Sequence, residues 1–303
     1  MDPPLSLPNA LLLSVALLHN PPPALHLGQR PPLPEVPMLH FTMDGFGGHR
    51  SRFDDIRLIH ELLEELPARL GLTPAMPPML LPYYNGVEPD DCGISGYVFL
   101  AGGHLTLHTF SFRECYFVDL VAPQMFDVRE AQAFIQNALP VRSVDVHTTR
   151  RPKAFDDIPV HPDEDFGPHL LLNIDGYTGP RDMDGLFKLF DNLPPRIDMT
   201  PIMRPYVLRS TTPEGRPVLS AMTMIAESHI ALHIEEDSER AYFDIFSCKF
   251  FDTTAVLDEL KAAFPGRSHT VQLISRGCGY RGRRTEREPE HARTKAWLGT
   301  RPA

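Results

Sequence analysis

The 303-residue chain has few cysteines, no long apolar run and no excess of positive charge, and each shortage excludes a class of protein. Its four cysteines show no CxxC spacing, which at this length favours reduced thiols over a disulfide framework and indicates a cytoplasmic location. The net charge of -10 argues against nucleic acid as the main partner. A small cationic molecule is a more compatible partner.

The amino-terminal segment lacks the features of a membrane span and of a secretion signal. Its one apolar run, residues 11–18, is too short to cross a bilayer, and the start Met1-Asp2-Pro3-Pro4 contains no basic residue. Prolines recur through the rest of this segment. We therefore predict that residues 1–37 form a disordered, proline-rich arm and that the protein has no membrane partner.

Hydrophobic periodicity becomes regular at residue 38 and predicts a similar series of elements twice. Between the two series, the aperiodic and proline-containing residues 150–167 are typical of a linker. The first series has strands at 38–43, 96–100, 105–110, 116–121 and 141–147, a further strand near 80–84, and helices at 53–66 and 128–138. The second has strands at 170–174, 218–225, 230–234, 241–247 and 270–275, and helices at 182–193 and 254–264.

The duplication predicts a first repeat at residues 38–149 and a second at 168–277, followed by a locally basic tail at 278–303. Each repeat is expected to carry helices on one face of a sheet, so that the two free sheet faces can pack together. We therefore predict an α+β fold, a four-layer α/β/β/α sandwich with pseudo-twofold symmetry. Because duplication can replace a dimer, a monomer or a homodimer is expected.

The centres of the two repeats align without gaps at an offset of 125 residues, and they differ at two reactive positions. Gly103 stands where the second repeat has Ser228, and Pro123 stands where it has Cys248. The simplest interpretation is one working centre, located in the second repeat. The matched pairs are Ser95 with Ser220, His104 with His229, His108 with His233, Phe117 with Tyr242, and Asp119 with Asp244.

The residues alone leave several alternatives open. His229 and His233 form an HxxxH pair that shares one face of a strand, as a zinc pair would, but no third ligand follows at a convincing spacing, so no metal is expected. A Ser-His hydrolase is disfavoured because no GxSxG elbow surrounds Ser228. Asp44 and Asp175, each before a glycine at the end of a predicted strand, are expected in turns.

The segment from Glu227-Ser228-His229 to His233, followed by Tyr242-x-Asp244 and Cys248, resembles the processing and catalytic segment of S-adenosylmethionine decarboxylases. In the first repeat, Gly93-Ile94-Ser95-Gly96 and His108-Thr109-Phe110 resemble the bacterial members of that family. The resemblance covers roughly residues 38–275. It is specific because serine, histidine and cysteine all fall at the family spacing.

The resemblance implies that Ser228 attacks the carbonyl of Glu227 and cuts the chain there, leaving a pyruvoyl cofactor at the start of a 76-residue fragment, residues 228–303. Ser220 and His233 would assist the cleavage, and Cys248 would return a proton to the substrate carbon. The pyruvoyl ketone would hold the substrate as a Schiff base and accept the electrons left by carbon dioxide. The implied role is a lyase of polyamine, and in particular spermidine, biosynthesis.

The sequence departs from the family pattern where the substrate would bind. The residues after His233 are Ile234-Glu235-Glu236-Asp237, so the acid that grips the substrate ribose would be Asp237 or Glu236. Related enzymes decarboxylate arginine or ornithine, which keeps these amino acids as alternative substrates. A non-catalytic regulatory homologue is a further alternative.

Overall fold

The duplicated pattern folds into two six-stranded antiparallel sheets of identical strand order. The computed structural model describes residues 37–83, 92–152, 157–284 and 289. The first sheet has the order β2-β3-β4-β5-β1-β6 and the second has β8-β9-β10-β11-β7-β12. The strands are β1 (Met38–Phe46), β2 (Met79–Tyr83), β3 (Gly93–Leu100), β4 (Gly103–Phe110), β5 (Cys115–Ala122), β6 (Ser143–Arg151), β7 (Gly167–Asp175), β8 (Tyr206–Thr211), β9 (Pro217–Ile225), β10 (Ser228–Glu235), β11 (Arg240–Ser247) and β12 (Ser268–Arg276).

The four longer helices begin at aspartate caps, which repeat along with the strands, whereas the short helix α1 (Arg50–Phe53) is capped by His49. The longer helices are α2 (Ile56–Arg69), α3 (Val128–Ala138), α4 (Met183–Arg196) and α5 (Thr253–Ala263). Asp127 and Asp252 each accept hydrogen bonds from two backbone N–H groups in the first turns of α3 and α5. Such a side chain satisfies donors that the helix itself leaves unpaired. The two caps lie 125 residues apart, the same offset as the central strands.

Two predicted helix boundaries are wrong, for the same reason. The predicted helix at 53–66 ends before Pro67, but α2 starts at the Asp55 cap and continues through Pro67 to Arg69. Likewise α4 runs three residues beyond the predicted end at 193 and contains two prolines. Each proline lies near the end of an amphipathic helix whose buried face packs on a sheet, and this packing outweighs the lost backbone hydrogen bond.

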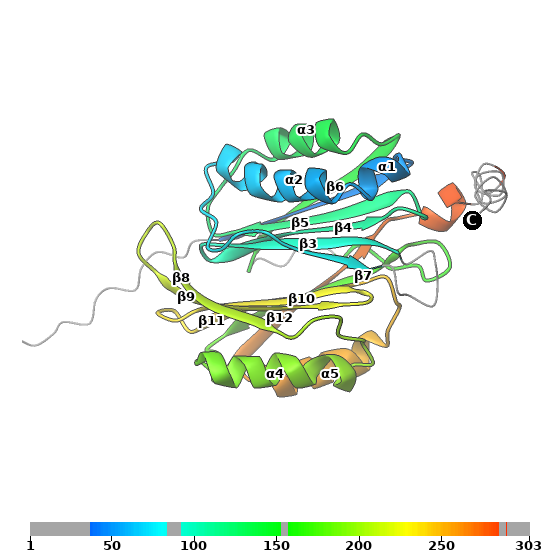
Figure 1. Cartoon of the computed structure of the whole chain (residues 1–303). Coiled ribbons are helices and arrows are strands. Elements are labelled where there is room, and N and C mark those ends of the chain that lie inside the picture. Colours follow the sequence, from blue (N-terminus) through cyan, green and yellow to red (C-terminus); the bar gives the residue numbers. More distant parts are fainter. Residues whose placement is uncertain (1–36, 84–91, 153–156, 285–288, 290–303) are drawn as a thin grey trace, which may run out of the picture. The chain divides into compact units, whose positions relative to one another are not determined.

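The elements form four layers, which confirms the predicted α+β sandwich. Helices α1, α2 and α3 cover the outer face of one sheet, α4 and α5 cover the outer face of the other, and the inner faces of the sheets meet (Figure 1). Each helix layer and its sheet enclose an apolar core. The inner faces instead bury aromatic, methionine, histidine, aspartate and arginine side chains. The polar chemistry of the molecule is therefore concentrated between the sheets.

The strand register shows which residues the pseudo-twofold symmetry relates. His40 pairs with Val121 and His169 with Phe246, so these two histidines are equivalent. By the same register Asp44 corresponds to Asn173. The similar Asp-Gly sequences at the ends of the two predicted strands are therefore not equivalent in space, and Asp44 is a buried strand residue instead of a turn residue.

The described part of the carboxyl-terminal tail packs against the first repeat. Tyr280 is buried in a cluster of phenylalanines that includes Phe46. Arg283 is ion-paired with Asp145 at 3.0 Å and lies over the Phe46 ring. The predicted arm at 1–37 falls almost wholly outside the described residues. Among the residues that the structure describes, no helix is both long and apolar enough to span a membrane.

Candidate active site

The candidate cleavage bond lies in a tight hairpin turn at one end of β10. Strands β9 and β10 pair from Ile225 opposite Ser228, so only Ala226 and Glu227 connect them. Ser228 has a positive φ of 155°, a conformation that residues with a side chain rarely adopt. Its side chain is buried, and its Oγ has no hydrogen-bond partner among the described residues. The hydroxyl is therefore not engaged elsewhere, and the backbone around it is strained.

The carbonyl that precedes Ser228 is held by a backbone donor. The N–H of Cys248 donates a 2.8 Å hydrogen bond to the carbonyl oxygen of Glu227. The Glu227 side chain accepts a second hydrogen bond, from the Thr200 N–H at 3.1 Å, which fixes the turn. A donor aimed at a carbonyl oxygen stabilises the negative charge that develops there when a nucleophile attacks the carbon. The residues present therefore fit formation of a pyruvoyl group from Ser228.

Cys248 lies directly after β11 and lines a cavity of about 420 Å³. Its half-buried side chain packs against the phenylalanine cluster between the sheets. Cys248 is thus placed beside both the candidate cleavage bond and a space large enough for a small ligand. The other residues that line the cavity are Arg113, Asp165, Phe166, Tyr280, Arg281 and Arg284.

Ser220 and His233 contact each other, but the structure does not bring them to Ser228. The Ser220 Oγ lies 2.8 Å from the His233 Nδ1, on directly opposed positions of β9 and β10. His233 is five residues along β10 from Ser228, which corresponds to about 16 Å at the usual rise of a strand. Its ring instead lies against His104 of the first repeat, beside Gly103. This geometry does not support the assisting role that the resemblance implied for Ser220 and His233.

The equivalent pair of the first repeat takes that place. The Ser95 Oγ lies 2.8 Å from the His108 Nδ1, and the His108 Nε2 lies 2.8 Å from the Nδ1 of His229, the residue after Ser228. Burial lowers the pKa of His108 well below its usual range, so its imidazole is neutral. The two repeats therefore combine at one site. The sequence signal was the pair of bacterial-type motifs around Ser95 and His108.

Glu236 and Asp237 lie at the wrong end of β10 to meet a substrate bound at Ser228. They follow Glu235, the last residue of β10, whereas Ser228 is the first. Glu236 is occupied by Arg209, with hydrogen bonds of 3.0 and 2.9 Å. The predicted substrate contact of these two acids is not supported by the geometry.

The pseudo-equivalent position in the first repeat cannot carry a serine in its present backbone conformation. A Cβ atom added to Gly103 would lie 1.9 Å from the carbonyl oxygen of Val121. Pro123, which takes the place of Cys248, offers neither a thiol nor a backbone N–H. The first repeat therefore lacks the nucleophile, the carbonyl donor and the thiol.

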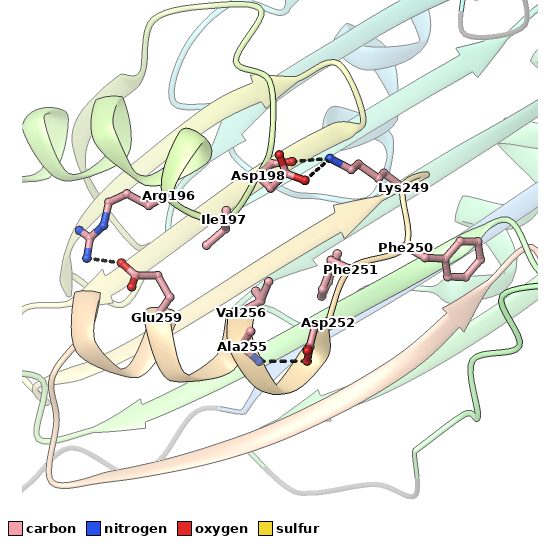
Figure 2. A pocket seen from close by; sticks show the side chains of 10 residues that line it. All are labelled: Arg196, Ile197, Asp198, Lys249, Phe250, Phe251, Asp252, Ala255, Val256 and Glu259. Carbon is pink, nitrogen blue, oxygen red and sulfur yellow. Dashed lines mark hydrogen bonds and ion pairs between the residues drawn. The ribbon is translucent and has the colours of Figure 1, made fainter.

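A second cavity, of about 340 Å³, lies between the end of α4 and the start of α5 (Figure 2). Its charged groups pair with one another: Lys249 with Asp198 at 2.6 Å, and Arg196 with Glu259. Asp252 accepts the hydrogen bonds that cap α5. Each of these charged side chains already binds another group of the protein, so we assign no ligand to this cavity.

Of the comparisons with known proteins, the family profile agrees with the resemblance noted in the sequence. Among solved structures, the chain is similar to the adenosylmethionine decarboxylase from Aquifex aeolicus VF5, with 22% identity and a TM-score of 0.34, over 41% of this chain and 98% of that one. It is also similar to an unknown protein from Galdieria sulphuraria, with 10% identity and a TM-score of 0.20, over 80% of this chain and 99% of that one. The search of curated protein sequences found no match. The profile of the S-adenosylmethionine decarboxylase family matches residues 39–152 and 169–277, so this internally duplicated chain belongs to that family.

Proposed function

We propose that this protein is a self-processing, pyruvoyl-dependent decarboxylase that acts on S-adenosylmethionine in polyamine synthesis. The proposal depends chiefly on the bond between Glu227 and Ser228. The buried Ser228 hydroxyl has no hydrogen-bond partner among the described residues, the backbone there has a φ of 155°, and the adjacent carbonyl accepts the Cys248 N–H. These features favour attack of the hydroxyl on the carbonyl that precedes it.

In the proposed cleavage, the Ser228 Oγ bonds to the carbonyl carbon of Glu227 while the peptide C–N bond breaks, and the hydroxyl proton passes to the released nitrogen. Loss of the Cα proton of Ser228 to a base and cleavage of its Cβ–Oγ bond then release the Glu227 carboxylate and leave a Cα=Cβ double bond, and return of a proton to Cβ turns the resulting enamine into an imine. Water replaces the nitrogen, which leaves as ammonia, so that a ketone remains at residue 228. The Ser95–His108–His229 chain of hydrogen bonds offers imidazoles that can move protons at this end of β10.

The ketone, once formed, supplies an electron sink for the pair left on the substrate carbon when carbon dioxide leaves. The protein supplies the surroundings. Cys248 lines the adjoining cavity, and its thiol is the group we assign to deliver a proton to that carbon. The phenylalanine cluster packed against Cys248 excludes water from one side of the site.

The lining of the cavity favours S-adenosylmethionine over arginine or ornithine. Phe166 and Tyr280 offer aromatic surface for a flat purine and for a sulfonium cation. Arg113, Arg281 and Arg284 also line the cavity, against the single carboxylate of Asp165. Asp165 already accepts hydrogen bonds from the Ser275 hydroxyl and the Gly279 N–H. The positive lining acts alike on the sulfonium of S-adenosylmethionine and on the second cation of arginine or ornithine, so the aromatic surface alone distinguishes these substrates.

A denaturing gel tests the cleavage and a carbon dioxide assay tests the substrate. We expect the wild-type protein to run as fragments of residues 1–227 and 228–303, and Ser228→Ala to run as the intact chain. Ser238→Ala, which alters a serine at the far end of β10, is the matched control and should cleave normally. Cut protein should release labelled carbon dioxide from S-adenosylmethionine, with arginine and ornithine assayed in parallel. An uncut wild-type chain would contradict the proposed self-cleavage.

A further inference from the structure

Six histidines are buried between the two sheets, far more than the proposed cleavage uses. Their pseudo-twofold arrangement forms two hydrogen-bonded pairs, with 2.8 Å between His104 and His233 and 2.8 Å between His108 and His229. The full set is His40, His104, His108, His169, His229 and His233. Buried polar groups are normally hydrogen-bonded, so those that lack a partner require an explanation.

Three side chains from both sheets direct polar atoms without a hydrogen-bond partner at one point, and a further histidine lies beside them. The His229 Nε2 lies 3.3 Å and the His104 Nε2 4.0 Å from the Oδ2 of Asp244, and the Nε2 of His169, whose Nδ1 accepts from Arg276, lies 3.7 Å from the same oxygen. All three residues have zero solvent exposure, and these nitrogens and both carboxylate oxygens have no hydrogen-bond partner among the described residues. The distances are too long for good N–H···O hydrogen bonds. Two nitrogens and an oxygen bound to one tetrahedral zinc ion lie about 3.4 Å apart.

The remaining ring nitrogens are held as metal-binding histidines require. The Nδ1 of His104 can donate to the Nε2 of His233, whose own Nδ1 faces the Ser220 hydroxyl. The Nδ1 of His229 can donate in the same way to His108. This proton arrangement leaves the Nε2 lone pairs of His104 and His229 free toward Asp244. Such a second layer of hydrogen bonds fixes the tautomer and orientation of a ligand histidine.

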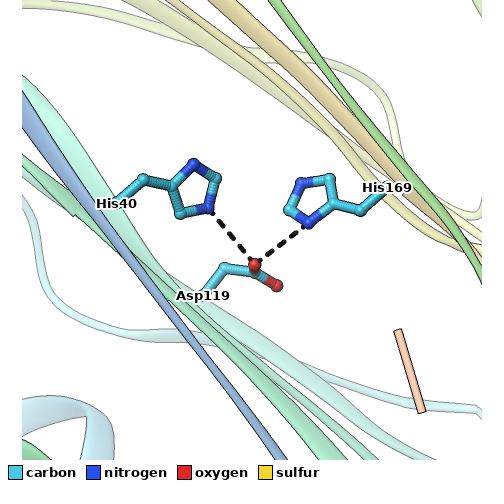
Figure 3. A group of neighbouring side chains, drawn as sticks. All are labelled: His40, Asp119 and His169. Carbon is cyan, nitrogen blue, oxygen red and sulfur yellow. Dashed lines mark hydrogen bonds and ion pairs between the residues drawn. The ribbon is translucent and has the colours of Figure 1, made fainter. Parts of the chain in front are cut away.

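The related cluster of His40, Asp119 and His169 does not have these properties. Figure 3 shows both rings directed at the Asp119 carboxylate, at 3.4 and 3.5 Å. The Arg276 guanidinium, however, donates to the same Asp119 oxygen at 2.7 Å and to the His169 Nδ1 at 3.0 Å. A permanent cation therefore already occupies the place where a metal ion would be bound.

Asp119 and Asp244 are pseudo-equivalent, but their neighbouring arginines bind different groups. The Asp244 carboxylate therefore remains available to bind a metal ion. Arg151 corresponds to Arg276, but its Nε donates to Asn173 and one of its terminal nitrogens to two backbone carbonyls. Its other terminal nitrogen stays 3.6 Å from Asp244. Asp44 and Asp119 thus share Arg276, whereas Asp244 has only the more distant Arg151. A bound cation would compensate the charge of Asp244.

We infer that His104, His229 and Asp244 bind one divalent transition-metal ion of the zinc class, which joins the two sheets. Two imidazoles and one carboxylate suit such ions better than magnesium or calcium, which prefer oxygen ligands. The three ligand atoms lie within 4.8 Å of one another, so metal binding requires the side chains to rotate until these atoms are about 3.4 Å apart. The inference does not depend on the proposed cleavage, because the ligands hold the ion whether or not the chain is cut.

Metal analysis of the full-length protein tests the inference directly. We expect about one zinc-class ion per chain after purification without chelator, and a fall in Tm when a strong chelator removes it. Addition of zinc to the stripped protein should restore the Tm. Cobalt(II) should bind with an absorption spectrum typical of mixed nitrogen and oxygen coordination. Metal content below about a tenth of an ion per chain, together with no change of Tm on adding zinc or cobalt, would overturn the inference.

Paired variants identify the ligands. Asp244→Asn should lower the metal content at least tenfold, whereas Asp119→Asn, the change at the equivalent carboxylate bound to Arg276, should keep it. His104→Gln is a second test if Asp244→Asn does not fold. Equal retention of metal in Asp119→Asn and Asp244→Asn, or equal loss in both, contradicts the assignment. So does full metal content in His104→Gln.

Discussion

The Nε2 of His108 lies 2.8 Å from the Nδ1 of His229, so a histidine of the first repeat is hydrogen-bonded to the residue that follows Ser228 in the second. The symmetric contact, between His233 and His104, lies next to Gly103 instead. The Ser-His pair of each repeat is therefore hydrogen-bonded to a histidine of the other repeat. One of the two resulting sites has a nucleophile and the other does not.

Two serine variants test this exchange between repeats. Ser95→Ala should slow the self-cleavage by about 100-fold or more, because it removes the hydroxyl bound to His108 at the Ser228 end of β10. Ser220→Ala removes the equivalent hydroxyl, bound to His233 beside Gly103, and should leave the cleavage rate nearly unchanged. A time course of fragment appearance after cell-free synthesis measures both rates. A larger fall in the cleavage rate in Ser220→Ala than in Ser95→Ala would show instead that a Ser-His pair acts on the site of its own repeat.

Much of the fold could be predicted from local pattern. Alternation and helical spacing located the sheets and helices, and the offset of 125 residues revealed the duplication. The boundaries at Pro67 and in α4 were wrong because packing of a helix on a sheet outweighs a local preference for ending it.

The site could be predicted only in part, because its assembly depends on how the sheets face each other. Sequence spacing identified Ser228 and Cys248, which are close through the local pairing of β10 and β11. It could not show that residues on the inner face of one sheet meet partners from the other repeat. The geometry therefore does not support the roles implied for Ser220 and His233, or for Glu236 and Asp237. The sequence spacing predicted no third ligand for a zinc site. The third ligand that we infer, Asp244, lies on a neighbouring strand.

Cys248→Ser should separate cleavage from turnover. The variant keeps the backbone N–H that donates to the Glu227 carbonyl, so we expect the chain to be cut. It replaces the thiol with a hydroxyl that gives up its proton less readily, so decarboxylation should fall about 100-fold or more. Mass spectrometry of the fragments and carbon dioxide release measure the two steps. Cys278→Ser, at an exposed cysteine outside the cavity lining, is the control, and the prediction is wrong if both variants turn over equally.

Gly103→Ala should destabilise the protein by about 1–3 kcal/mol. The added methyl group would meet the Val121 carbonyl oxygen at 1.9 Å and force β4 and β5 apart. At this chain length the change corresponds to a fall in Tm of at least about 2 °C per kcal/mol. Gly282→Ala, where nothing lies within 4 Å of the added carbon, is the matched control and should leave the Tm almost unchanged. Thermal denaturation followed by circular dichroism measures both, and equal Tm values would contradict the steric argument.

Arg276→Met should cost about 3–5 kcal/mol of unfolding free energy, and more than Arg151→Met. Arg276 donates to Asp44 at 2.8 Å and to Asp119 at 2.7 Å, so its removal leaves two buried carboxylates without their cation. Arg151 donates to the neutral side chain of Asn173 and to backbone carbonyls and lies 3.6 Å from Asp244, so its removal costs hydrogen bonds and one looser ion pair. Denaturant unfolding of the two variants against wild type gives the difference. If Asp44→Asn combined with Arg276→Met recovers part of the loss, the cost arises from the unpaired carboxylate, whereas no recovery would point to lost packing of the long side chain.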